Sequence, residues 1–121
     1  RFQSIVPKGY GCPPEGPTQQ FLNQLGRHGN RPAHIHFFIT ADGHRKLTTQ
    51  LNIENDPFVY DDFAYATREG LVVPIVEHTD EAVLKANGMS EPFGEMEFDF
   101  KLSKLVEGVD NQVVERPRLQ A

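Results

Sequence analysis

The chain has 121 residues, with 12 Lys and Arg against 17 Asp and Glu and a formal net charge of −5. This length fits one small domain, and an acidic chain without a clustered stripe of Lys and Arg argues against a nucleic-acid partner. No apolar run approaches the length that spans a membrane, and the start of the chain lacks a signal-peptide pattern, so we expect no membrane partner and a cytoplasmic location. The single cysteine, Cys12, excludes an internal disulfide and a cysteine-based zinc site.

The first quarter of the chain predicts a strand, a loop and a helix. Residues 1–7 alternate as a strand does, and the chain begins with Arg1 rather than Met, which indicates an amino-terminal truncation. Residues 8–17 are rich in Gly and Pro and predict a loop that carries Tyr10. The apolar spacing over residues 18–25, followed by Gly26, predicts a helix of two turns.

Two central segments predict an antiparallel hairpin. Residues 33–40 place Ile35, Phe37 and Ile39 on one face and both His34 and His36 on the other. Residues 47–53 resume the two-residue period after the turn signal Asp42-Gly43. The two segments therefore predict paired strands with one apolar and one polar face.

The remaining elements are short. An irregular loop or single helical turn is expected over residues 61–68, an edge strand over 71–76 because of Pro74, a helix over 79–87 and an alternating strand over 94–105. The tail from residue 107 is polar. Short strands between Gly and Pro turns predict a mainly β fold, an antiparallel β-sandwich with a few short helices, incomplete at its amino-terminal side.

The two histidines are the first candidates for chemistry. Because His34 and His36 lie two apart on a strand, their imidazoles project from the same face and are able to bind one metal ion, although a pair of solvated histidines is the alternative. A cupin site is disfavoured because Thr40 and Ala41 stand where its carboxylate belongs. Tyr10 is either a surface side chain or an oxygen ligand suited to Fe(III).

Four segments together resemble the intradiol ring-cleavage dioxygenases, and within them the bacterial enzymes that act on catechol. They are residues 4–11 (SIVPKGYG), 26–36 (GRHGNRPAHIH), 47–50 (LTTQ) and 61–68 (DDFAYATR). The order of the four is specific, and the resemblance spans nearly the whole chain. Residues 1–121 are therefore expected to be the carboxy-terminal part of a catalytic dioxygenase domain.

The resemblance implies a non-haem Fe(III) cofactor and a set of site residues. Tyr10, His34 and His36 match three of the four metal ligands, and the fourth, a second tyrosine, is expected upstream of this chain. Tyr10 would also accept a catechol proton. Three further matches are Arg31, which would stabilise negative charge on the substrate, Gln50, which would order the site, and Phe63, which would line the catechol ring.

The activity implied is cleavage of catechol by O2 to cis,cis-muconate, in aromatic degradation through the β-ketoadipate pathway. Two alternatives stay open: an enzyme that cleaves chlorocatechol or hydroxyquinol, and a metal-free β-domain that binds small aromatics or another subunit. The resemblance further implies a homodimer formed through an upstream helical region. The chain by itself is expected to be inactive, because one tyrosine ligand is absent from it.

Overall fold

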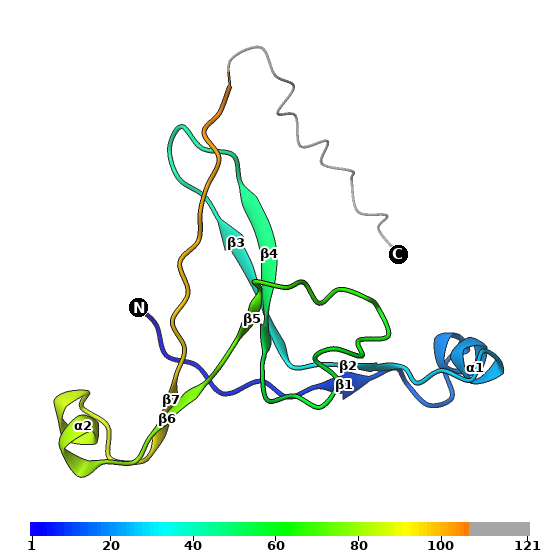
Figure 1. Cartoon of the computed structure of the whole chain (residues 1–121), viewed down its shortest axis with the longest axis horizontal. Helices are drawn as coiled ribbons and strands as arrows, with labels where there is room; N and C mark the ends of the chain where they lie inside the picture. Colours follow the sequence, from blue (N-terminus) through cyan, green and yellow to red (C-terminus); the bar gives the residue numbers. More distant parts are fainter. Residues whose placement is uncertain (107–121) are drawn as a thin grey trace.

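A computed structural model of the chain describes residues 1–106, which form three small sheets and two short helices (Figure 1). In chain order the elements are β1 (Tyr10–Gly11), α1 (Pro17–Gln24), β2 (Asn30–Arg31), β3 (His34–Ile39), β4 (Leu47–Ile53), β5 (Val72–Val73), β6 (Val76–His78), α2 (Glu81–Ala86) and β7 (Phe93–Glu95). Strands outnumber helices, as the sequence predicts. The predicted polar tail from residue 107 lies outside the described residues.

The β3–β4 hairpin forms the centre of the molecule. Its strands pair antiparallel, with His34 opposite Asn52 and His36 opposite Gln50, which confirms the predicted hairpin. Strand β5 then joins β4 in the parallel direction, an exception to the antiparallel arrangement. The 18 residues between β4 and β5 provide the long crossover that a parallel pair requires.

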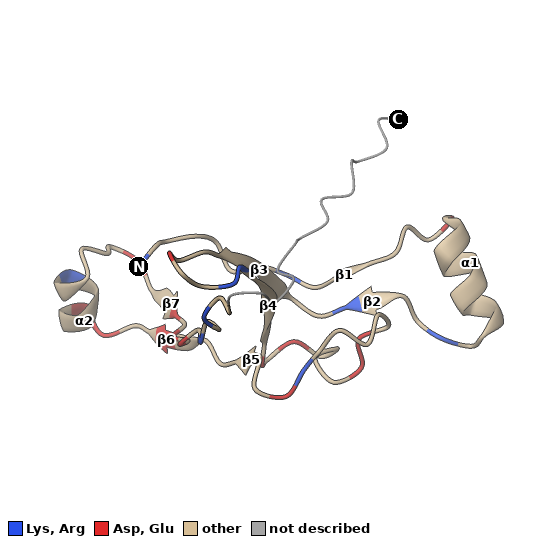
Figure 2. Ribbon diagram, turned by 90° about the horizontal axis from the view of Figure 1, so that it is seen from above, with Lys and Arg blue, Asp and Glu red and all other residues tan. Residues whose placement is uncertain are grey.

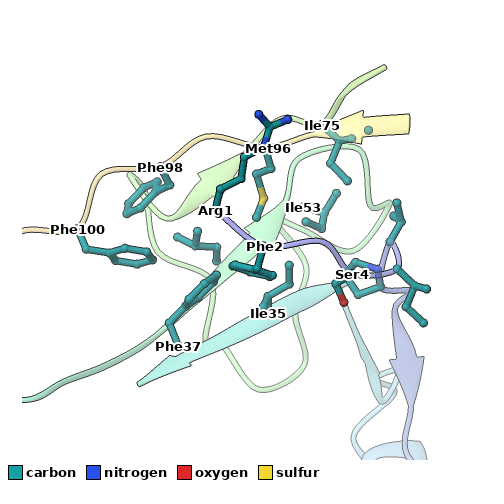
Figure 3. A pocket seen from close by; sticks show the side chains of 15 residues that line it. Arg1, Phe2, Ser4, Ile35, Phe37, Ile53, Ile75, Met96, Phe98 and Phe100 are labelled. Atoms are coloured by element: carbon teal, nitrogen blue, oxygen red, sulfur yellow. The ribbon is translucent and has the colours of Figure 1, made fainter. Parts of the chain in front are cut away.

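The apolar face of the hairpin is covered by extended chain. Ile35, Phe37 and Ile53 line a groove of about 240 Å³ together with side chains from residues 1–7 and 94–100 (Figure 3). Ring contacts continue across the groove, with Phe37 and Phe100 centroids 4.9 Å apart. The core therefore lies on this side of the hairpin, and the opposite side is left for polar groups.

Two predicted strands are wrong in extent. Residues 1–7 form no strand, and of residues 94–105 only the first two belong to β7, which pairs with β6. Residues 94–100 lie extended with alternate side chains along the apolar face, so a period of two arises there without a paired strand. Residues 1–7 run along the same face, but most of their side chains are exposed. Further along, the Ser103 carbonyl and the Leu105 amide bond the hairpin turn at Arg45 and Gly43.

Pro74 divides the strand predicted over residues 71–76. Strand β5 ends just before this proline and β6 begins two residues after it, because proline has no amide hydrogen to give to a ladder. Both predicted helices form, at opposite ends of the molecule (Figure 1). Pro17 begins α1, and the Asp80 carboxylate caps α2 by accepting from the Ala82 and Val83 amides.

Charged residues are mixed along the described chain. Figure 2 shows Lys and Arg interspersed with Asp and Glu, with both signs in α2 and in the loop between β4 and β5. Within residues 1–106, no helix has the length and apolar character needed to cross a membrane.

Candidate metal centre

The polar face of the hairpin carries the two histidines. His34 and His36 project from the same side of β3, their ring centroids are 4.9 Å apart and the rings are nearly perpendicular. On the neighbouring strand the same face presents Asn52 and Gln50. The predicted placement of both histidines on one face, with Gln50 opposite, is confirmed.

A short ribbon brings Tyr10 to this face. Strand β1 pairs with β2 so that Tyr10 lies opposite Arg31, and β2 leads through Pro32 into β3. The Tyr10 ring centroid is 5.7 Å from that of His34, and the side chain is 55% exposed. Strands from two different sheets thus converge on one space.

Gly9 allows the ribbon to lie this close. A Cβ atom on Gly9 would lie 2.8 Å from the Arg31 carbonyl oxygen and 2.8 Å from Asp56 Oδ2. That carboxylate oxygen also accepts a hydrogen bond from the Ala33 amide at 2.9 Å. A side chain at position 9 would therefore displace the backbone that leads into Tyr10.

The orientation of the His34 ring, and the tautomer of its neutral form, are set by its surroundings. Nδ1 lies 2.7 Å from the Pro32 carbonyl oxygen, and since a carbonyl only accepts, Nδ1 donates. In the neutral ring Nε2 is then left with its lone pair. A histidine oriented by a carbonyl, with the other nitrogen bare, is the usual arrangement of a metal ligand.

Arg31 lies between the ligand candidates. Its Nη1 is 3.4 Å from His34 Nε2 and donates to the Tyr10 hydroxyl oxygen at 3.5 Å. The hydrogen bond with Asp62 raises the pKa of Arg31 above its ordinary value, although burial opposes this, and the Tyr10 contact adds to the increase. The guanidinium therefore keeps its charge beside Tyr10 and His34.

Asp62 was not singled out by the sequence, yet it is the acidic partner of Arg31. Its Oδ1 accepts from Arg31 Nε at 3.1 Å and its Oδ2 from Nη2 at 3.2 Å. The Ala64 and Ala66 amides also donate to it. Burial by itself would raise the pKa of Asp62, but these hydrogen bonds, led by that from Arg31, lower it below its ordinary value.

Gln50 joins the same network. Arg31 Nη2 donates to Gln50 Oε1 at 3.4 Å, and Gln50 Nε2 donates to Asn52 Oδ1 at 3.1 Å. Both the oxygen and the nitrogen of the Gln50 amide are therefore hydrogen-bonded. Asn52 is fully buried, and its Nδ2 has no hydrogen-bond partner among the described residues. Asn52 is a second residue that the sequence did not reveal, because asparagine in a strand carries no signal of its own.

Phe63 is the residue that follows Asp62 in the chain. Its amide donates to the Asn30 carbonyl at 3.1 Å, and its own carbonyl accepts from Arg27 Nη2 at 3.3 Å. These bonds hold the Phe63 backbone beside β2. The contact of its ring with a substrate stays a prediction.

The donors gathered here fit a ferric ion. One phenol and two imidazoles are oxygen and nitrogen ligands that iron accepts. A metal ion at His34 would use the Nε2 lone pair, so the contact from Arg31 Nη1 would give way to it. Within residues 1–106 no group of three or more His, Cys, Asp and Glu is arranged to hold a metal, so a site here depends on tyrosine.

Comparison with known proteins assigns the class. Residues 1–104 match the model of a family described as Dioxygenase. Among solved structures, catechol 1,2-dioxygenase from Acinetobacter sp. ADP1, inhibited by bound mercury, superimposes with a TM-score of 0.88 at 75% identity. That match covers 95% of this chain and 37% of the solved one. The chain belongs to the dioxygenase family of intradiol ring-cleavage enzymes, which confirms the predicted sandwich fold class.

Two curated relatives are both named for the cleavage of catechol. Catechol 1,2-dioxygenase of Acinetobacter baylyi is 73% identical over 119 residues, and catechol 1,2-dioxygenase 1 of Acinetobacter lwoffii is 55% identical over 119 residues. Each alignment covers 98% of this chain and 38% of the relative. The chain thus spans little more than a third of the length of these enzymes.

Proposed function

We propose that the protein containing this chain is an enzyme that cleaves catechol between its two hydroxylated carbons with O2, giving cis,cis-muconate in aromatic degradation. Residues 1–121 would form the carboxy-terminal part of its catalytic domain. The observation that carries the proposal is the convergence of Tyr10, His34 and His36 with Arg31 on one polar face. The identity to two catechol 1,2-dioxygenases supports catechol as the substrate.

Three side chains of this chain would hold the iron. Tyr10, His34 and His36 are the proposed ligands, with a tyrosine from outside the chain as the fourth. Bound there, ferric ion supplies the Lewis acidity and electron transfer that make a catecholate reactive toward O2. His34 is already oriented for this task by the Pro32 carbonyl.

The other residues act on protons and charge. The Tyr10 oxygen, a phenolate when it serves as a ligand, would take a proton from a catechol hydroxyl and become a phenol. Its side chain is exposed and therefore open to a substrate. Arg31 Nη1 would then stabilise the negative charge that develops on the substrate oxygen. Gln50 accepts a hydrogen bond from the same guanidinium and would help to hold it in place. Phe63 would lie against the aromatic ring of catechol.

Two further properties belong to this proposal. A homodimer is expected of the full-length protein, through a region outside this chain. A cytoplasmic location is expected as well, and the single cysteine is compatible with a reducing compartment.

The test uses the full-length protein loaded with ferric iron. We expect O2 uptake in equal amounts to cis,cis-muconate formed from catechol, together with a visible absorption band from tyrosinate bound to Fe(III). Parallel assays with chlorocatechol and hydroxyquinol measure preference. Faster turnover of either compound would replace catechol as the substrate, and binding of aromatics without iron or turnover would contradict the enzymatic proposal.

A further inference from the structure

We propose that Asp62 is the positioning residue for Arg31, and that it sets the direction in which the guanidinium faces the substrate. This inference rests on the proposed function. Asp62 lies in the loop between β4 and β5, remote in sequence from Tyr10, His34 and His36. Its side chain is hydrogen-bonded to Arg31 and to the Ala64 and Ala66 amides, so its hydrogen-bonded link to the proposed ligands runs through Arg31.

The geometry of the ion pair fixes the plane of the guanidinium. Asp62 binds Arg31 through both Nε and Nη2, at 3.1 and 3.2 Å. Because the guanidinium is a rigid planar fork, two anchored nitrogens determine where the third one points. The third nitrogen is Nη1, which is directed at the Tyr10 oxygen and His34 Nε2.

Both oxygens of the Asp62 carboxylate are fully engaged in hydrogen bonds. Its two oxygens accept four hydrogen bonds, two from Arg31 and two from the Ala64 and Ala66 amides. The Asp62 side chain is 1% exposed and that of Arg31 13% exposed. Water therefore competes weakly for either partner, so the pair is held far more firmly than a surface ion pair.

The same carboxylate also shapes the segment that carries Phe63. Besides the two amide bonds to its side chain, the Asp62 carbonyl accepts from the Tyr65 amide at 2.9 Å. Tyr65 has a φ of 52°, a left-handed conformation that is uncommon for a side chain of this size. Asp62 thus links the orientation of Arg31 to the conformation of the loop over residues 62–66.

A purely structural ion pair would be the competing explanation. The two explanations differ in what happens when Arg31 is absent. If Asp62 acts mainly through Arg31, its removal costs much more activity while Arg31 is present than when Arg31 is absent. A structural Asp62 would cost activity in either background, because the loop is disturbed in both.

The experiment is a double-mutant cycle in the full-length, iron-loaded protein. Asp62→Asn places an NH2 group against donors, so at least one oxygen loses its hydrogen bonds. We expect kcat/KM for catechol to fall about 10- to 100-fold, the usual effect of removing a supporting residue, with iron content unchanged. In the Arg31→Ala background the same substitution should change kcat/KM less than about 2-fold.

Asp61→Asn is the matched control. It removes the same charge from the adjacent position, where Asp61 is exposed and pairs with His28 at 2.9 Å. We expect its activity to stay within about 2-fold of the unchanged protein. If Asp62→Asn does not fold, Arg31→Lys tests the same contact from the other partner, since lysine cannot form the two-pronged bond. Full activity of Arg31→Lys would overturn the inference.

A second measurement does not depend on activity. A crystal structure of metal-free Asp62→Asn should show the guanidinium turned away from Tyr10 and His34. An unchanged guanidinium, or an equal loss of kcat/KM with and without Arg31, overturns the positioning role. Absence of catechol cleavage by the unchanged protein would instead contradict the proposed function, and the crystal structure would still decide the role of Asp62.

Discussion

At the scale of single residues, the two histidines of the site differ in how they are held. His34 donates from Nδ1 to the Pro32 carbonyl and is half-buried, whereas His36 is exposed on the strand beyond it. His34 would therefore lose little freedom on binding a metal, because its ring orientation is already set. His36 has no such orienting bond within residues 1–106, so the ion itself would have to order its ring. Part of the free energy of its bond to iron would be offset by this loss of freedom.

His36→Ala in the full-length protein is expected to abolish iron retention, because the remaining ligands lose both affinity and geometry. Arg31→Ala is the comparison: it should retain iron and turn over catechol slowly, since it removes charge stabilisation and no ligand. Iron is measured by metal analysis after gel filtration and turnover by muconate formation. An equal loss of iron in both variants would show that the assigned roles are wrong.

The Arg31–Asp62 pair predicts how stability depends on pH. The folded pKa of Asp62 lies below its ordinary value of 3.8, so the pair contributes its stability above that pH and loses it as the pH falls through the lower folded value. Asp62→Asn should lower the free energy of unfolding by about 3 kcal/mol near neutral pH, the cost of breaking a buried pair. Denaturant unfolding of both proteins at pH 7 and below pH 4 measures the difference, which should shrink in acid. A constant difference would contradict this prediction.

At the scale of elements, the site depends on how the β1–β2 ribbon meets the hairpin. Pro32 and Ala33 are buried at the junction, and Asp56 bonds the Ala33 amide from the loop that follows β4. The junction therefore fixes Tyr10 relative to His34, although the two lie in different sheets. Gly9 is the position at which this junction is most closely packed.

Gly9→Ala should displace Tyr10 and weaken iron binding, because the added Cβ would lie 2.8 Å from two oxygen atoms. The contrast is Gly43→Ala in the hairpin turn, where φ is +69° and the space around the Cβ is open. That variant should cost about 1 kcal/mol of stability and leave iron content unchanged. Iron content and thermal unfolding are measured together. Equal iron loss in both variants would mean that a general loss of stability explains the effect. The close packing at Gly9 would then not be its cause.

The elements also show what the sequence was able to predict. Residues 33–40 and 47–53 combine strict alternation with a turn signal, and both form the expected strands. Residues 94–105 alternate as clearly, but only residues 94 and 95 belong to a strand, and Lys104 forms a single bridge with His44. Alternation shows that one face is directed inward and does not require a paired strand along the whole segment. Asp62 escaped prediction because its partner Arg31 lies 31 residues away, a contact that no local pattern encodes. Asn52 escaped it because an asparagine in a strand carries no signal of its own.

At the scale of the whole molecule, residues 1–106 leave apolar side chains open to solvent. Phe2 is 68% exposed and Ile5 87% exposed, although both line the groove over the hairpin. The described chain spreads from α1 to α2 around a narrow central hairpin (Figure 1). Such a surface favours association when the chain is isolated.

The 121-residue chain by itself should be inactive toward catechol even with ferric iron added. With Tyr10 as its phenolate, release of that oxygen to the substrate would leave two imidazoles, too few to retain a ferric ion firmly. The visible band of tyrosinate bound to iron should also be faint or absent. The chain is refolded with ferric iron, its spectrum is recorded and muconate formation is assayed against the full-length protein. Comparable rates would show either that the missing tyrosine is dispensable or that Tyr60 or Tyr65 takes its place.

The two-faced hairpin also limits how this protein is able to evolve. His34 and His36 share a face while Ile35 and Phe37 share the other, so inserting or deleting one residue within β3 would turn the histidines into the apolar groove. Changes of length in β3 are therefore excluded unless they come in pairs. The turn at residues 40–46 has no such restriction, since extra residues there leave both faces in place. Length variation among descendants of this chain should accumulate in that turn, and β3 should change by substitution alone.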